Sequence, residues 1–124
     1  MKIQDSIVLI TGANGGIGSA LVHELLQRGA KKIYLGARNE ASLQTLLASS
    51  SRLVPLTLDV TKPEQVERAA ASTADITLLI NNAGLATFSG ALSVPDTAKA
   101  RQEMEVNYFG MLALTCLLYT SPSP

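Results

Sequence analysis

The 124-residue chain has a single cysteine, Cys116, no excess of either charge, and no long apolar segment. One cysteine excludes an internal disulfide and is compatible with a reducing compartment. Ten basic and ten acidic residues cancel, so no overall field attracts nucleic acid or an anionic membrane. The most apolar stretch, residues 111–119, is too short to cross a bilayer, and the N-terminus lacks an apolar signal segment. We therefore expect a cytoplasmic protein without nucleic-acid or membrane partners.

Composition and length limit the domain organisation. Hydrophobic residues make up 47% of the chain and charged residues 16%, which is typical of a globular protein and not of a disordered one. A chain of 124 residues holds at most one domain. We assign no metal ligands.

The chain is organised around residues 6–18, where an apolar run breaks into glycines and leads into a helical pattern. Residues 7–10 are apolar on both faces, as expected of a central parallel strand covered by helices. Three glycines, Gly12, Gly16 and Gly18, follow this run. Without Cβ atoms they allow, in turn, a sharp bend of the backbone, the approach of a phosphate and close packing of the helix on the strand. The helix N-terminus would hold the anion. The turn is therefore predicted to cradle a nucleotide phosphate, with an unliganded glycine turn as the alternative.

The rest of the chain alternates between strand and helix patterns, which predicts an α/β fold with a doubly wound parallel sheet. The predicted strands are residues 7–10, 32–36, 53–58 and 76–80, and helices are expected over 17–27, around 43–47, over 64–72 and after Asp96. Because Pro55 cannot donate to a sheet ladder, we expect the third strand at an edge, in the order 3-2-1-4. The predicted sheet is truncated after its fourth strand and the following helix.

Local patterns refine the helices. Ile17 shares helical spacing with the apolar positions of the first helix, whereas His23 lies on the polar side and is expected to face water. Gly29 is expected to end this helix. Thr61 and Glu64 have the spacing of a capping box for the third helix.

The end of the second strand of a doubly wound sheet lies beside the adenosine ribose of a bound dinucleotide. Here the chain has Arg38, followed by Asn39 as the expected N-cap of the next helix, and no carboxylate before Glu40. A guanidinium pairs with a 2′-phosphate, whereas a carboxylate would repel it. Arg38 therefore favours NADP(H) over NAD(H). An ordinary solvated arginine is the alternative.

Polar residues also follow the third and fourth predicted strands. Asp59 can accept a hydrogen bond from the exocyclic amine of adenine, or it can simply close the turn. The asparagines at 81–82 bring hydrogen-bonding groups to the end of a buried strand, and the Ala-Gly pair at 83–84 leaves room for a flat group beside the backbone.

Three of these segments resemble motifs of the short-chain dehydrogenase/reductase family. Residues 11–18 resemble its Thr-Gly-x-x-x-Gly-x-Gly turn, Asp59-Val60 its adenine-side pair, and residues 81–84 its Asn-Asn-Ala-Gly motif; the resemblance extends from about residue 7 to about residue 115. It implies a Rossmann-like fold and hydride transfer between a nicotinamide and a carbonyl or alcohol of a small molecule. The residues expected to bind the cofactor are Gly12, Asn14, Gly16, Ile17, Gly18, Arg38, Asp59, Val60, Asn82, Ala83 and Gly84.

The family's catalytic pattern is missing from the chain. The family uses a serine, a tyrosine as general acid/base, and a lysine four residues after that tyrosine. The tyrosines at 34, 108 and 119 are followed four positions later by Arg38, Leu112 and Ser123. Asn107 alone resembles a catalytic residue, the asparagine whose backbone helps to hold a water in a proton relay; an asparagine that bridges helix and loop is the alternative.

We therefore interpret the chain as the N-terminal, cofactor-binding fragment of an NADP(H)-dependent oxidoreductase, inactive by itself, whose full-length form is expected to be a homo-oligomer. Residues 1–115 form the expected domain, and residues 116–124, with prolines at 122 and 124, are expected to be a non-native or disordered tail. Two alternatives remain: a non-catalytic NADP-binding module or sensor, and a relative of the nucleotide-sugar epimerases.

Overall fold

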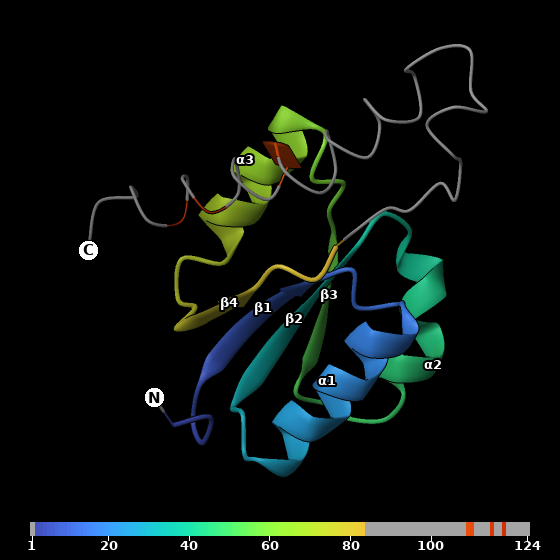
Figure 1. The fold of residues 1–124 in the computed structure, drawn as a ribbon, viewed down its shortest axis with the longest axis vertical. Helices are drawn as coiled ribbons and strands as arrows, with labels where there is room; N and C mark the ends of the chain where they lie inside the picture. The colour runs from blue at the N-terminus through green and yellow to red at the C-terminus, as the bar shows by residue number, and fades with distance from the viewer. Residues whose placement is uncertain (1, 84–108, 111–114, 116–117, 119–124) are drawn as a thin grey trace, which may run out of the picture.

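The structure is a computed structural model that describes residues 2–83, 109–110, 115 and 118 (Figure 1). Strands and helices alternate along residues 2–83. In chain order the elements are β1 (Ile7–Thr11), α1 (Gly16–Gln27), β2 (Lys32–Ala37), the short 3₁₀ helix η1 (Glu40–Leu43), α2 (Gln44–Leu47), β3 (Leu53–Thr57), α3 (Pro63–Ser72) and β4 (Leu78–Ile80).

The described strands form a four-stranded parallel sheet in the order β3-β2-β1-β4, as the sequence predicted. Helices cover both faces of this sheet: α1 and α2 lie on one side and α3 lies on the other (Figure 1). Alternate residues of β1 face opposite sides of the sheet: Val8 and Ile10 pack with α1 and α2, whereas Leu9 packs with α3. Burial on both faces explains why the strand is continuously apolar.

The first helix ends at the predicted glycine. Gly29 has a φ of 87°, which favours glycine because it lacks a Cβ. Its N–H donates to the carbonyl of Leu26, and the N–H of Ala30 donates to the carbonyl of Leu25. This pair of bonds is the Schellman arrangement, which satisfies carbonyls that the helix leaves without partners.

Strand β3 lies at an edge, as Pro55 predicted. The N–H of Ile33 donates to the carbonyl of Arg52, and the N–H of Leu58 donates to the carbonyl of Ala37. Even-numbered residues of this strand therefore face β2, and Pro55 falls at a position whose backbone points away from the sheet. Its missing N–H costs the ladder nothing there, and it removes a donor from the free edge.

Three local predictions were wrong. The capping box does not form: α3 begins at Pro63 with Lys62 as its N-cap, and no side chain of the described residues caps it. The hydroxyl of Thr61 donates to the Asp59 carboxylate at 2.6 Å, and the residue lies one position before the N-cap. Ile17 is 73% exposed and is not part of the buried face of α1. Strand β4 begins at Leu78 and not at residue 76, because the N–H of Ile76 donates to Thr73 in the preceding turn.

Candidate nucleotide-binding site

The glycine turn between β1 and α1 lies at the carboxyl edge of the sheet, and two of its glycines are fixed by close contacts. Gly12 has a φ of 66°, and a Cβ added there would lie 2.9 Å from the Cα of Ala83. A Cβ on Gly18 would collide with the carbonyl oxygen of Gly12. Both positions therefore require glycine for packing, as predicted for a turn that brings helix and strand together.

Gly16 differs from these two glycines. A Cβ added at Gly16 would meet no atom of the described residues within 4 Å, so these residues give no packing reason for a glycine there. The N-cap of α1 is Gly15, and no side chain in the described part of the chain makes a capping hydrogen bond at this helix end. The helix N-terminus, with its free N–H groups and positive dipole end, is thus left uncapped beside open space. This is the arrangement that an anionic group can occupy.

A threonine joins the two motifs that the sequence analysis treated separately. The hydroxyl oxygen of Thr11 accepts hydrogen bonds from the N–H groups of Asn82, at 3.0 Å, and Ala83, at 2.9 Å. The side-chain amide of Asn82 donates to the carbonyl of Gly12 at 3.0 Å. The carboxyl ends of β1 and β4 are therefore tied together directly at the turn. Thr11 was not among the predicted site residues, although its place at the end of an apolar strand was a signal.

The turn after β3 carries Asp59. Its Oδ1 atom accepts hydrogen bonds from the N–H of Thr61, at 2.9 Å, and from the hydroxyl of Thr61, at 2.6 Å. Burial by itself would raise the pKa of Asp59, but the bonds from Thr61 and the positive charges of Lys62 and Arg38 outweigh it and lower that pKa. Asp59 is therefore an ionised hydrogen-bond acceptor at neutral pH. Its bonds to Thr61 close the turn, which is one of the two interpretations that the sequence analysis gave.

The remaining predicted residues have different surroundings. Asn14 and Arg38 are exposed on the turns after β1 and β2, and Val60 is buried beside Asp59. Gly110 packs on Val60 so closely that an added Cβ would lie 2.8 Å from the Val60 carbonyl oxygen. No local sequence pattern signalled that contact. Gly84, Asn107 and the helix expected after Asp96 lie outside the described residues.

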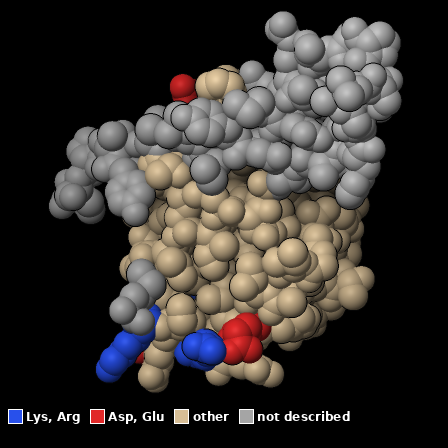
Figure 2. Space-filling view, in the orientation of Figure 1, with Lys and Arg blue, Asp and Glu red and all other residues tan. Residues whose placement is uncertain are grey.

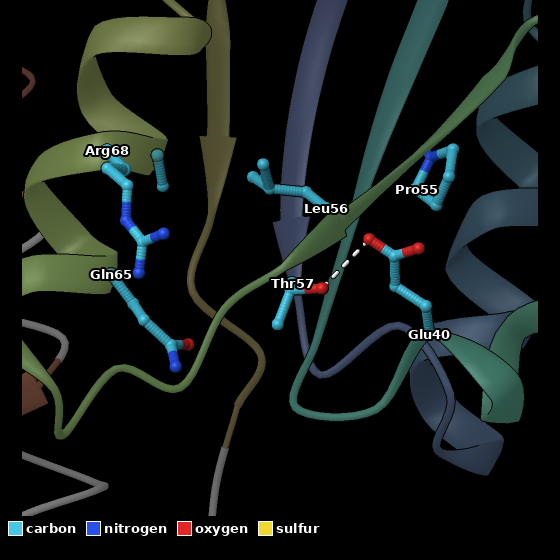
Figure 3. A pocket seen from close by; sticks show the side chains of 7 residues that line it. Glu40, Pro55, Leu56, Thr57, Gln65 and Arg68 are labelled. Carbon is cyan, nitrogen blue, oxygen red and sulfur yellow. Dashed lines mark hydrogen bonds between the residues drawn. The ribbon is translucent and has the colours of Figure 1, made fainter.

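A cavity of about 260 Å³ lies farther out, at the edge of β3. Figure 3 shows Gln65 and Arg68 on one side of the strand and Glu40, bonded to the Thr57 hydroxyl at 2.8 Å, on the other. This cavity does not include the glycine turn. Within residues 2–83 and the four others described, no group of three or more His, Cys, Asp or Glu side chains could hold a metal ion. No helix in the same part of the chain has the length and apolar character needed to cross a membrane.

The fold and the turn define a nucleotide-binding α/β protein, and comparison with known proteins gives its family. The family model described as short chain dehydrogenase matches residues 6–121. The chain belongs to this family of oxidoreductases, as the sequence motifs indicated.

Similar proteins agree with the family assignment. A short chain dehydrogenase from Burkholderia cenocepacia, solved in complex with NADP, is 44% identical with a TM-score of 0.88, over 96% of this chain and 49% of that one. An NADPH-bound carbonyl reductase from chicken fatty liver is 30% identical with a TM-score of 0.82, over 94% of this chain and 48% of that one. An 11-beta-hydroxysteroid dehydrogenase A of Sesamum indicum is 33% identical over 91% of this chain.

The chain spans 35% of the length of the Sesamum relative and about half of each of these solved chains. The family model's match over residues 6–121 contains the sheet β3-β2-β1-β4 and the glycine turn described above.

Proposed function

We propose that this chain is the coenzyme-holding part of an NADP(H)-dependent short-chain oxidoreductase, which transfers hydride between the nicotinamide and a carbonyl or alcohol carbon of a small molecule. The observation that carries the proposal is the open space at Gly16 beside the uncapped N-terminus of α1. A dinucleotide's pyrophosphate fits this chemistry, because it is an anion that needs close approach to N–H groups and no side chain in the way.

The proposed cofactor contacts follow the carboxyl edge of the sheet. Gly12, Asn14, Gly16, Ile17 and Gly18 would hold the pyrophosphate and its surroundings, Asp59 and Val60 the adenine, and Asn82, Ala83 and Gly84 the nicotinamide ribose. Ile17 supports this assignment, since its large apolar side chain is 73% exposed beside the turn and can contact a ligand there. Bound nicotinamide supplies or accepts the hydride. Asn107 keeps its proposed role in the proton relay.

Arg38 supports the preference for NADP(H). It is exposed directly after β2, and its positive charge acts on Asp59, which places a cation near the proposed adenosine side. A guanidinium there can pair with the 2′-phosphate that distinguishes NADP from NAD. The Burkholderia and chicken relatives, whose structures contain NADP and NADPH, agree with this assignment.

A titration with NADPH and NADH, followed by nicotinamide fluorescence, tests the proposal. We expect the wild-type chain to bind NADPH more tightly than NADH, and Arg38→Ala to weaken NADPH about tenfold or more while NADH changes less than about threefold. Arg28→Ala is the matched control, because Arg28 is a surface arginine that pairs with Glu24 at the far end of α1. Equal affinity for both nucleotides would remove the cofactor assignment, and no binding of either would remove the function.

A further inference from the structure

The turn that carries Asp59 and Val60 is held by two residues that do not belong to the proposed site. One is Gln65 on α3, and the other is Gly110, which lies far along the chain. Each acts on a different part of the turn. Gln65 contacts the backbone of Asp59, and Gly110 contacts Val60.

Gln65 contributes a short hydrogen bond. Its Oε1 atom accepts from the N–H of Asp59 at 2.7 Å, and the side chain is partly buried. Its helix is anchored on the sheet by Val66 and Ala69, which are both about 1% exposed. Figure 3 shows Gln65 extending from α3 below Arg68, at the lower end of the cavity beside β3. The start of the Asp59 turn is therefore attached to α3 by the hydrogen bond to the amide oxygen of Gln65.

Gly110 limits the turn from another direction. A Cβ at this position would lie 2.6 Å from a methyl carbon of Val60 and 2.8 Å from its carbonyl oxygen. The methyl group could rotate away, but the carbonyl belongs to the backbone of the turn itself. A side chain at position 110 would consequently push the turn, since backbone cannot yield as a side-chain end does.

The carboxylate that these contacts position still has a free acceptor. Both bonds from Thr61 reach Oδ1 of Asp59, and Oδ2 makes no hydrogen bond with any of the described residues. An amine of adenine, which needs an acceptor in a fixed direction, matches this remaining oxygen.

We infer that Gln65 and Gly110 are positioning residues for the adenine end of the bound nucleotide, and that they act by fixing the Asp59–Val60 turn. This inference rests on the proposed function, because it requires that the adenine lie against that turn. Neither residue touches the nucleotide in this account. Their loss should weaken recognition of adenosine and leave recognition of the pyrophosphate at the glycine turn unchanged.

Two probes separate the halves of the site. Adenosine 2′,5′-bisphosphate reports on the adenosine side, and inorganic pyrophosphate reports on the glycine turn; both are titrated calorimetrically into the 124-residue chain. Gln65→Met has similar length and helix propensity but no strong acceptor, whereas Gln65→Glu keeps an acceptor oxygen. Gln27→Met is the matched control, because Gln27 is an exposed residue at the end of α1.

We expect Gln65→Met and Gly110→Ala to weaken adenosine 2′,5′-bisphosphate about tenfold, the loss that one misplaced hydrogen bond causes, with pyrophosphate affinity within about twofold. Gln65→Glu and Gln27→Met should bind both probes within about threefold of wild type. Urea titrations verify that each variant is folded under the binding conditions.

Three results would overturn the inference. If Gln65→Met binds the bisphosphate as tightly as wild type, the tie to Asp59 has no role in recognition. If it loses both probes equally, Gln65 supports the fold only. If the wild-type chain binds neither probe, the proposed function fails together with this inference, whereas the first two results leave the proposed function intact.

Discussion

The two ends of the sheet differ in their charged side chains and in the backbone that they leave uncovered by the described residues. At the amino end, polar side chains bind one another: Asp75 pairs with Lys32 at 2.7 Å and accepts from the Tyr34 hydroxyl at 2.8 Å. At the carboxyl end, none of the described residues covers the Gly16 backbone or caps the N-terminus of α1 with a side chain. Figure 2 shows charged side chains of both signs gathered at the lower end of the visible face, towards the amino ends of the strands in Figure 1. The amino end thus carries paired side chains, whereas the carboxyl end carries the proposed nucleotide site.

The ion pair at the amino end shifts the pKa values of both of its members. The Lys32 ammonium, followed by the Tyr34 hydroxyl, holds the pKa of the Asp75 carboxyl below its usual value, and Asp75 in turn raises the pKa of Lys32. The Lys32 side chain is 33% exposed and that of Asp75 is 44% exposed, so salt screens the pair and its contribution to stability is small.

The largest expected effect comes from Thr11→Val, which removes the oxygen shared by two N–H groups while keeping the shape of the side chain. Thr11 is 2% exposed, so the N–H groups of Asn82 and Ala83 would lose their partner in a place with little water. We expect a loss of about 2–4 kcal/mol in the free energy of unfolding, measured in urea, and weaker NADPH binding. The control is Thr57→Val, which removes one exposed hydrogen bond to Glu40 and should cost less than about 1 kcal/mol. Equal losses in the two variants would show that Thr11 does not join the motifs.

A smaller effect is expected from Arg52→Met, at the amino end of the sheet. The Arg52 guanidinium donates to the carbonyl of Ala30 at 2.7 Å and to that of Leu26 at 3.3 Å, at the C-terminal end of α1. We expect a loss of about 1–2 kcal/mol in urea, because charged donors to helix carbonyls are among the stronger hydrogen bonds. NADPH affinity should stay within about twofold, with both forms compared where they are fully folded. A large loss of NADPH affinity would show that the amino end of the sheet also affects nucleotide binding.

Tyr34→Phe should have a smaller effect again. It removes the hydroxyl bonded to Asp75 and leaves the ring in the core beside Leu9. The expected cost is about 0.5–1 kcal/mol, the net value of one ordinary hydrogen bond, with unchanged nucleotide affinity. Thermal unfolding with and without NADPH measures both quantities in one experiment, and a changed ligand-induced shift would count against the account.

The smallest expected effect is a shift in the titration of Asp59. Thr61→Val removes the hydroxyl bond to Oδ1, so the pKa of Asp59 should rise towards its ordinary value, as followed by NMR of the carboxyl carbon. A depressed carboxyl pKa stabilises the fold above the unfolded-state pKa of about 3.9, and this stability is lost as the pH falls through the lower folded-state pKa. The variant should therefore lose part of its stability at neutral pH and show a weaker dependence below about pH 4. An unchanged Asp59 titration would contradict the cause assigned here.

Much of the fold was predictable because its signals are local. The apolar run at residues 7–10, the glycines that follow it and the proline in β3 each restrict the backbone where they stand, and they agree with the strand order of a doubly wound sheet. The capping box failed for a local reason as well. Thr61 had two acceptable partners, the helix end and Asp59, and the spacing alone did not say which of them it would bind.

The site was less predictable where it depends on contacts between distant segments. The bond from Asn82 to Thr11 joins residues 71 positions apart, and the contact between Gly110 and Val60 also crosses the fold. Periodicity and turn signals carry no information on such pairs. Ile17 shows the same limit, because its spacing matched a buried helix face while the turn left it exposed. The predicted domain boundary at residue 115, the roles of all the predicted cofactor-binding residues and the role of Asn107 stay predictions.

The most direct test of the central claim is Gly16→Leu, measured for stability in urea and for NADPH binding by fluorescence. An added side chain at Gly16 meets open space within the protein, so the free energy of unfolding should stay within about 1 kcal/mol of wild type, since leucine is the better helix former. The same side chain would occupy the place of the pyrophosphate, and NADPH affinity should fall at least about a hundredfold. A variant that is stable and still binds NADPH as tightly as wild type would contradict the assignment of this turn to the coenzyme.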